Sequence, residues 1–228
     1  GEYSPAWHDT LAELPEAPLF LIANEFFDAL PVRQFLRDTD GWRERVVGLE
    51  DDALAFGLTD AAPLAALEHR LGDTVPGDLI MHCPAGETCI AEIAGRIARH
   101  GGAALIIDYG GWDLKEDTFQ AIHQGAQAPP LTHPGNADLT AHVDFQSLTR
   151  AALAEGAACH GPVRQGEILD RLGIELRAHA LARRAFAPET VRAAHRRLTH
   201  PAEMGDLFKG MAVTPLNHAA PPGFADEP

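Results

Sequence analysis

Two uninterrupted apolar runs stand out in the chain, and polar residues follow each of them. Residues 19–23 (LFLIA) lead into Asn24 and Glu25, and residues 103–107 (AALII) lead into Asp108 and Tyr109. A short apolar run without alternation predicts a parallel strand that is buried on both faces. Ligands of open α/β sheets bind beyond the carboxyl ends of the strands, so the polar residues after each run are candidates for a binding site.

Apolar residues at helical spacing predict helices between and after these strands. Ile90, Ile93 and Ile97 recur in this way within residues 87–100, and a Gly-Gly pair at 101–102 ends that helix. Further helices are predicted over residues 63–71, 145–155, 165–172, 176–185 and 189–200. A helix, a glycine pair and a buried strand form half of a βαβ unit, so the pattern indicates an α/β fold with a parallel, Rossmann-like sheet.

The segments between these elements have a different pattern. Short extended stretches at 34–37, 42–49 and 53–58 are separated by turn compositions (DTDG, EDD), which predicts a small antiparallel meander beside the main sheet. Residues 111–136 are rich in Pro, Gln and His and weakly patterned, which predicts a long loop that either covers a site or is disordered. We therefore expect three parts: a main domain (1–32 and 72–216), an inserted meander with a short helix (33–71), and a loose Pro-rich tail (217–228).

Composition narrows the classes of protein. Apolar residues make up 46% of the chain, which is enough for a core, and the net charge is −15, from 33 acids against 18 bases. Such a charge argues against binding to nucleic acid, and it permits a basic protein partner or an arginine-bearing substrate. Three cysteines do not form a disulfide framework, and neither a membrane span nor a signal peptide is visible, so a reducing, cytoplasmic location in a bacterium is expected.

Asn24, Glu25 and Asp28 are the first candidates for chemistry. An amide and two carboxylates at a strand end can hold a cation, and carboxylates match a guanidinium bidentately. The alternative, which the local sequence slightly favours, is a helix cap followed by exposed acids. Asp108 and Tyr109 would face the same crevice if the two strands are parallel neighbours. Their alternative is a tight turn capped by Asp108, in which the following glycines supply a positive φ.

His142 and Asp144 are the third candidates, since residues two apart on an extended segment point the same way and can act as a base and its orienting acid. The local sequence favours the alternative that Asp144 caps the next helix and His142 lies on the surface. A hydrolase built on these two residues lacks a nucleophile, because no GxSxG elbow is present. No metal-ligand spacing such as HExxH and no phosphate loop occur either, so no metal is expected.

The chain resembles the MidA family of S-adenosylmethionine-dependent methyltransferases. The motifs that carry the resemblance occur in order from Trp7 to Pro215: Trp7 followed by LAELP, then LIANEFFDALPVRQF, GWRERVV, GGAALIIDYG, DTFQA, PGNADLTAHVDF, GPVRQGEILDRLGI and MGDLFKGMAV. Each motif alone is weak, but eight in order make a specific match.

The resemblance implies a class I methyltransferase fold with added elements, and methyl transfer from S-adenosylmethionine to an arginine of a protein. The mitochondrial member of the family is an assembly factor of respiratory complex I, so a complex I subunit is an expected partner. By motif, Glu25 and Asp28 would be catalytic and hold the guanidinium, while Asn24 and Trp7 would border the cofactor. The acceptor side would be lined by Asp108, Tyr109, His142 and Asp144.

The chain also departs from the family pattern. It contains no GxGxG turn followed by an acid for the ribose, which the family places before Trp7. We therefore expect only the later part of the methyltransferase domain here, an incomplete S-adenosylmethionine site, and an exposed sheet edge that favours aggregation or a homodimer. The family usually has an acid at Met81 and a histidine at Gly125. The alternative function is a non-catalytic assembly or binding protein that keeps the fold.

Overall fold

The computed structural model describes residues 4–184 and 186–225. The last residues of the predicted tail, 226–228, lie outside the described residues. The chain divides into two compact units: a first unit of Gly1–Asn24, Glu87–Ile107 and Ser147–Pro228, and a second unit of Glu25–Gly86 and Asp108–Gln146. Each unit is described by itself.

The first unit contains the parallel strand pair that the apolar runs predict. β1 (Leu19–Asn24) pairs in parallel with β6 (Gly102–Gly111), and the sheet continues in the order β1-β6-β12-β11. β12 (Phe208–Pro215) and β11 (Ala157–Arg164) pair in antiparallel fashion. The prediction of a parallel sheet is therefore confirmed for β1 and β6, and the sheet as a whole is mixed.

The expectation that β1 is buried on both faces is wrong. Its side chains alternate between half-buried and exposed, with Phe20 82% and Ile22 74% exposed. β1 is the last strand in the sheet order of the described chain, and nothing in that part of the chain covers this face. The unbroken apolar run therefore did not distinguish a covered face from an uncovered one.

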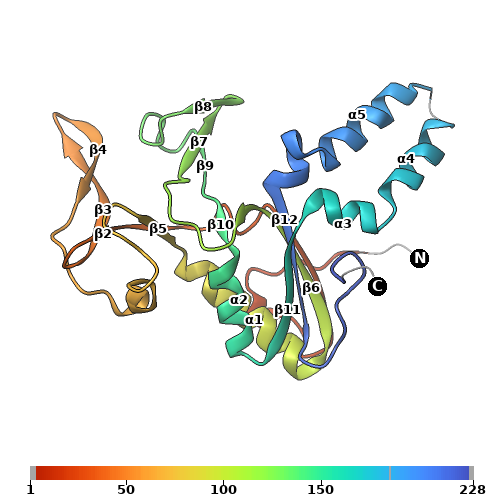
Figure 1. The fold of residues 1–228 in the computed structure, drawn as a ribbon, viewed down its shortest axis with the longest axis horizontal. Helices are drawn as coiled ribbons and strands as arrows, with labels where there is room; N and C mark the ends of the chain where they lie inside the picture. Colours follow the sequence, from red (N-terminus) through yellow and green to blue (C-terminus); the bar gives the residue numbers. More distant parts are fainter. Residues whose placement is uncertain (1–3, 185, 226–228) are drawn as a thin grey trace. The chain divides into compact units, whose positions relative to one another are not determined.

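The helices follow the predicted spacing closely. They are α1 (Pro84–His100), α2 (Phe145–Ala154), α3 (Gln165–Arg171), α4 (Ile174–Ala182) and α5 (Pro188–Thr199), with short turns η1 (Leu11–Glu13) and η3 (Pro201–Gly205). Ile90, Ile93 and Ile97 are at most 2% exposed, so one face of α1 supplies the core as its period predicts. α4 and α5 pack against each other as a helical hairpin (Figure 1).

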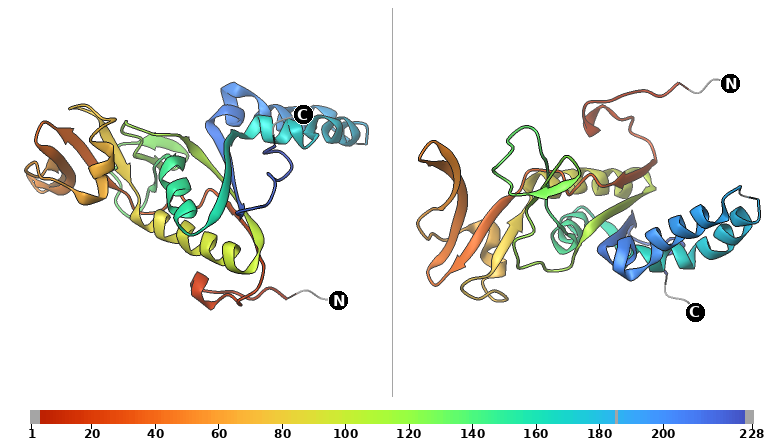
Figure 2. Two further views of the ribbon diagram at one scale, coloured as in Figure 1. Left: turned by 60° about the horizontal axis from the view of Figure 1, so that its bottom comes forward. Right: turned by 90° about the horizontal axis from the view of Figure 1, so that it is seen from above.

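The second unit contains the predicted meander with one strand added. Its sheet has the order β4-β3-β2-β5, from β4 (Ala53–Leu58), β3 (Gly41–Glu50), β2 (Arg33–Asp38) and β5 (Leu79–His82), and all pairs are antiparallel. β3 and β4 form a strongly curved hairpin (Figure 2). A cluster of Phe35, Trp42, Leu67 and Ile80 packs against η2 (Ala65–Arg70), so the predicted short helix is a 3-10 helix.

The prediction of a long loop over residues 111–136 is wrong. This region holds β7 (Gln120–His123) and β8 (Ala126–Ala128), which form a three-stranded sheet with β9 (Asp138–Thr140) in the order β8-β7-β9. The turn between β7 and β8 has positive φ at Gln124 (51°) and Gly125 (79°), as in the two-residue turns that join hairpin strands. The strands are too short for the alternation of apolar residues to show in the sequence.

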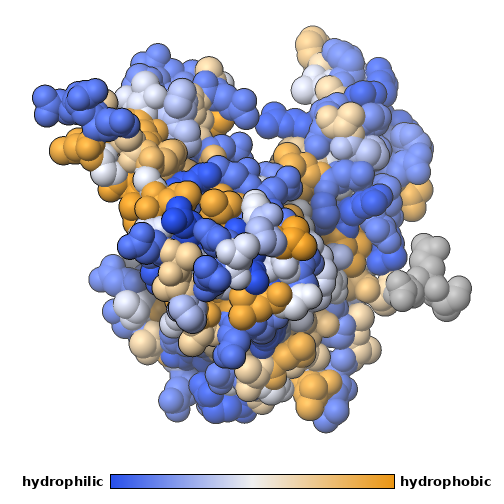
Figure 3. Space-filling model, turned by 60° about the vertical axis from the view of Figure 1, so that its left-hand side comes forward, coloured by the Kyte–Doolittle hydropathy of each residue, from blue (hydrophilic) through white to orange (hydrophobic). Residues whose placement is uncertain are grey.

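The part of the tail that the structure describes contacts the first unit. The carbonyl oxygen of Gly223 accepts a hydrogen bond from Arg171 of α3 (3.2 Å), and Gly223 itself is buried. Among the described helices, none combines the length and the apolarity that a membrane crossing requires. Apolar side chains nevertheless reach the surface in patches between polar ones (Figure 3).

Candidate functional site

The carboxylate of Asp108 organises the loop that follows β1. Asp108 is fully buried, and its Oδ2 accepts the backbone N–H groups of Phe26 (3.2 Å), Phe27 (3.1 Å) and Asp28 (3.3 Å). Three converging N–H groups form a nest for an anion, so the acid fixes the backbone that carries Glu25 and Asp28. The two polar sequences predicted to meet at one sheet edge therefore do meet within the second unit.

Asp108 and Tyr109 lie inside β6, not after it as the apolar run suggests. β6 continues to Gly111 because β10 (Val143–Asp144) pairs in parallel with its last residues. The alternative of a capped turn with a positive φ is also wrong, since neither Gly110 nor Gly111 has a positive φ. Gly110 is needed for another reason: a Cβ there would lie 2.1 Å from the carbonyl oxygen of Val143.

Asp28 is the acid of this site whose hydrogen bonding is incomplete. It is 5% exposed, its Oδ2 accepts the hydroxyl of Tyr109, and its Oδ1 has no hydrogen-bond partner in the described structure. The N–H of Ala141 donates to its backbone carbonyl (3.0 Å). Leaving a buried acceptor unpaired costs about 1–3 kcal/mol, and such a group in a folded protein calls for an explanation such as catalysis or ligand binding.

Burial and charge shift the pKa values of this cluster. The pKa of Asp108 is raised to about 7: burial is the largest cause, the charge of Asp28 adds to it, and the backbone N–H bonds partly oppose both effects. Burial, followed by the hydrogen bond to Asp28, raises the pKa of Tyr109 well above its usual value. Tyr109 therefore stays protonated near neutral pH and keeps donating to Asp28.

His142 and Asp144 have different surroundings. The ring of His142 packs edge-on against the ring of Tyr109, with the two ring centroids 5.5 Å apart. The Oδ1 of Asp144 accepts the N–H of Gln146 (3.0 Å) at the start of α2 and the N–H of Asp113 (3.3 Å), so the cap is confirmed for Asp144. His142 is half-buried, so the expectation that it lies on the surface is wrong. Burial raises the pKa of Asp144 despite the opposing N–H bond and the charge of Arg70, whose Nη1 lies 3.9 Å from its Oδ2.

Arg70 is a residue that the sequence did not single out. Its side chain is 4% exposed and forms ion pairs with Asp73 and Asp113 besides Asp144. A buried arginine of this kind ties η2 to the segment after β6 and to the start of α2. A lone arginine in a polar stretch is usually a surface residue, so the sequence offered no signal for it.

The remaining predicted residues are spread over both units. Glu25 is exposed and belongs to the second unit, with φ at 49°. A non-glycine residue in the left-handed region of backbone conformation costs about 1–3 kcal/mol, and such residues are often found at functional sites. In the first unit, Asn24 is the exposed last residue of β1 and Trp7 is 89% exposed.

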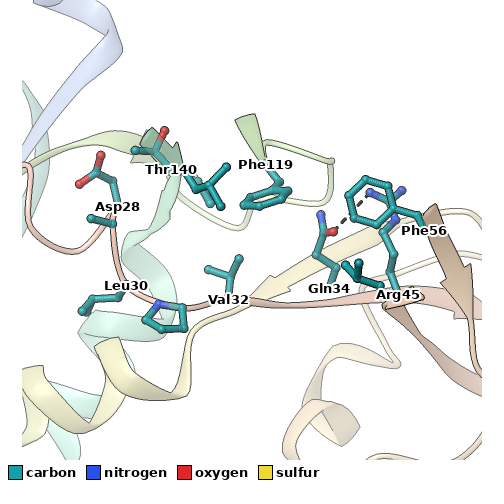
Figure 4. A pocket seen from close by; sticks show the side chains of 13 residues that line it. Asp28, Leu30, Val32, Gln34, Arg45, Phe56, Phe119 and Thr140 are labelled. Carbon is teal, nitrogen blue, oxygen red and sulfur yellow. Dashed lines mark hydrogen bonds between the residues drawn. The ribbon is translucent and has the colours of Figure 1, made fainter. Parts of the chain in front are cut away.

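Asp28 lines a pocket of about 380 Å³ within the second unit (Figure 4). Asp28 and Thr140 lie at one end and Arg45 and Phe56 at the other, with apolar side chains between them. The lining residues are Asp28, Ala29, Leu30, Pro31, Val32, Gln34, Arg45, Val47, Phe56, Phe119, Leu139, Thr140 and Ala141. The sequence did not predict this pocket, because its walls join the segment 28–32 to β2, β3 and β4 and to the missed β9, which lie far apart along the chain.

The far end of the pocket is closed by a paired arginine. Arg45 forms an ion pair with Asp117, and Gln34 donates to the same carboxylate (2.8 Å). The guanidinium of Arg45 also stacks over the ring of Phe56 at 5.2 Å. Arg45 is therefore neutralised, which leaves the carboxylate of Asp28 to set the charge at the other end. An apolar channel that ends at an acid suits a long side chain with a cationic tip.

The described residues supply only part of what S-adenosylmethionine requires. Cys83 alone joins β5 to α1, the first helical residues are Pro84, Ala85 and Gly86, and this is not a glycine-rich turn; no GxGxG occurs in the chain. Asp108 already accepts four backbone N–H groups, so it does not serve a ribose. The part of the chain that the structure describes holds no cluster of three or more metal ligands.

Comparison with solved structures defines the class of protein. The chain superposes with a TM-score of 0.82 and 29% identity on a protein from Burkholderia thailandensis whose crystal structure contains bound S-adenosyl-homocysteine, covering 96% of this chain and 59% of that one. A native crystal structure from the same organism gives a TM-score of 0.79 over 94% of this chain and 60% of that one. The fold is accordingly that of a class I-like methyltransferase.

Sequence comparison then gives the family. Residues 2–163 match the family described as "Putative S-adenosyl-L-methionine-dependent methyltransferase", and the chain belongs to this family. It is 36% identical to the mitochondrial protein arginine methyltransferase NDUFAF7 of Xenopus laevis (92% of this chain, 49% of that protein). The human protein of that name is 35% identical (92% and 48%), and the Drosophila melanogaster homologue 37% identical (92% and 50%). The chain thus spans about half the length of the curated relatives it matches.

Proposed function

We propose that the complete product of the gene encoding this chain transfers a methyl group from S-adenosylmethionine to an arginine of a protein. The observation that carries the proposal is the buried, incompletely hydrogen-bonded carboxylate of Asp28 at the end of an apolar pocket. The family membership and the naming of relatives as protein arginine methyltransferases support the same reaction.

In this proposal the pocket positions and polarises the acceptor. The methylene groups of the substrate arginine lie along Val32 and Phe119, and Asp28 Oδ1 accepts a guanidinium N–H. Tyr109 holds Asp28 through its hydroxyl, and Glu25 bonds the guanidinium from the loop. Two carboxylates localise the positive charge away from the nitrogen that attacks, which matters because guanidinium is not deprotonated in bulk near neutral pH. When bound, S-adenosylmethionine would supply the methyl group and leave as S-adenosyl-homocysteine, and the acceptor nitrogen gives up one proton to solvent water.

Replacement of the acids tests the proposal. Asp28→Asn and Glu25→Gln are each expected to lower the turnover number about 10- to 100-fold, because a hydrogen bond to a charged group contributes about 1.5–3 kcal/mol. The complete gene product would be incubated with labelled S-adenosylmethionine and a lysate from cells that lack the gene. Methylarginine would be quantified by mass spectrometry.

Asp60→Asn is the matched control, since it removes an exposed carboxylate of the same unit that does not line the pocket. It is expected to leave methylation unchanged. Unchanged turnover in both acid variants would sink the residue assignment. Absence of any methylarginine with the wild-type protein would instead favour the non-catalytic assembly protein.

The acceptor and the location belong to the proposal as well. A respiratory complex I subunit is the first acceptor to examine, because of the resemblance to the MidA family. A cytoplasmic location in a bacterium agrees with the cysteines, since no disulfide joins Cys83, Cys89 or Cys159, all of which the structure describes. Identification of the methylated protein by mass spectrometry tests the acceptor, and immunodetection of the enzyme in cell fractions tests the location.

A further inference from the structure

A second cavity adjoins β4 and differs in character from the pocket at Asp28. It has a volume of about 680 Å³ and lies between one strand and a proline-rich segment. Its lining residues are Ala53, Leu54, Ala55, Phe56, Pro129, Pro130, Leu131, Thr132 and Pro134. We call it the β4 groove. Both of its walls belong to the second unit.

The β4 groove runs along the edge of a strand. Successive side chains of a strand point to opposite faces, so a cavity bordered by four consecutive residues, 53–56, contacts the edge and not one face. β4 pairs with β3 on one side, and no strand of the described residues pairs its other side. Pro129, Pro130 and Pro134 have no backbone N–H, so the opposite wall offers few donors that could pair with this edge.

The charge around the groove is mainly acidic. Neither segment that builds it, residues 46–69 or residues 116–149, contains a lysine or an arginine. Arg45 lies next to the groove over the ring of Phe56, but its charge is paired with Asp117. The acids of these segments are Glu50, Asp51, Asp52, Asp60, Glu68, Glu116, Asp117, Asp138 and Asp144. The first three form the exposed turn that leads directly into β4. A basic occupant is therefore favoured over an acidic or a neutral one.

The groove adjoins the pocket of Asp28, because Phe56 lines both. We propose that the β4 groove binds an extended, basic segment of the protein substrate by strand addition, and so presents the arginine of that segment to the pocket. This inference rests on the proposed function. The backbone of the segment pairs with the free edge of β4, while its apolar side chains fill the groove and its cations face the acidic turn.

The probe is a fluorescein-labelled decapeptide of alternating valine and lysine around one central arginine. Its binding to the complete gene product would be followed by fluorescence anisotropy. Leu54→Lys, which places a cation on the groove wall, is expected to weaken binding at least 10-fold. Leu58→Lys is the matched control, since it lies on the same strand with similar exposure (45% against 40%) but outside the groove, and less than a 2-fold change is expected.

A second groove variant and an acidic peptide test whether the effect of Leu54→Lys is specific to the groove. Leu131→Lys, on the opposite wall, is expected to weaken binding as Leu54→Lys does, and it replaces Leu54→Lys if thermal melts show that variant to be unfolded. A peptide in which glutamate replaces each lysine is expected to bind at least 10-fold more weakly. Equal affinities for the groove and control variants, or for the two peptides, would overturn the proposal. A wild-type dimer that Leu54→Lys dissociates in light scattering would also overturn it, in favour of a second copy of the chain.

Kinetics separate this inference from the proposed function. If both hold, Leu54→Lys raises KM for the methylated peptide with little change in kcat, whereas Asp28→Asn lowers kcat and weakens peptide binding less than Leu54→Lys does. Peptide binding without any methylation would contradict the proposed function but not the proposal that the β4 groove binds the peptide. Methylation of the peptide with identical KM in Leu54→Lys and Leu58→Lys would contradict only the proposal that the β4 groove binds the peptide.

Discussion

Two neighbouring carboxylates, Asp28 and Asp108, differ in what surrounds each oxygen. Both are buried, but Asp108 accepts four backbone N–H groups, whereas one oxygen of Asp28 has no partner in the described structure. The sequence identified both acids as candidates from their positions near strand ends. It could not assign their roles, because the donors that hydrogen-bond a carboxylate can lie about 80 residues away in the sequence.

Asp108 should give the protein a pH-dependent stability. Its pKa rises from 3.8 to about 7 on folding, so between these values the folded protein holds a proton that the unfolded chain has released. The stabilisation is fully present below about pH 4 and is lost as the pH rises through 7. Each tenfold difference in proton affinity between the folded and unfolded states corresponds to about 1.4 kcal/mol. Asp108→Asn is expected to lower the melting temperature overall and to flatten its fall between pH 4.5 and 7.5.

Calorimetry over that range would measure the slope for each variant. Asp28→Asn is an informative companion, because removing the second cause of the raised pKa should lower the pKa of Asp108 and flatten the slope in part. A slope that is identical in the wild type and Asp108→Asn would show that this group does not carry the dependence.

β6 is the element on which the candidate site is built. Its first half pairs with β1, and Gly110 and Gly111 pair with β10. The sequence predicted the first half from its apolar residues and placed the end of the strand before Asp108. Pairing with β10 extends it, and β10 is two residues long, which is below what periodicity can detect. The sequence pattern does not detect the β7–β8 hairpin or the three-residue strand β9 for the same reason, and β9 supplies Leu139 and Thr140 to the pocket of Asp28.

Gly110 tests the importance of that extension. Gly110→Ala would bring a methyl group against the carbonyl of Val143, and we expect it to lower the free energy of unfolding by about 1–3 kcal/mol or more. Gly48→Ala in β3 is the control, since a Cβ there meets nothing within 4 Å, and it is expected to be neutral or to stabilise by up to about 1 kcal/mol. Urea unfolding of both variants would decide, and equal values would count against a close contact at Gly110.

At the scale of the molecule, charge is the dominant property. The net charge is −15, and like charges repel one another more strongly in the compact state than in the unfolded chain. Salt screens this repulsion over distances of about 10 Å at 0.1 M ionic strength. The sequence alone establishes this property, because it depends on composition and not on which residues meet. The same charge makes a cationic segment the natural partner of the β4 groove.

Raising the NaCl concentration from 20 to 300 mM at pH 8 is therefore expected to raise the melting temperature by about 2–4 °C, which corresponds to roughly 1 kcal/mol of relieved repulsion. At pH 5.1, near the isoelectric point, the same change should have little effect. Differential scanning fluorimetry can follow both series. A melting temperature that falls with salt at pH 8 would mean that attractive ion pairs outweigh the net repulsion.

The parallel pairing of β1 with β6 also sets an order for folding during translation. β1 leaves the ribosome first, but its partner and the acid that anchors the loop after it lie about 80 residues later in the chain. At 5–20 residues per second, the ribosome needs roughly 4–16 s to synthesise that stretch. Throughout that interval the apolar residues of β1 lack the strand with which they pair in the folded protein. Asp28 reaches its final surroundings only after residues 108–109 have emerged.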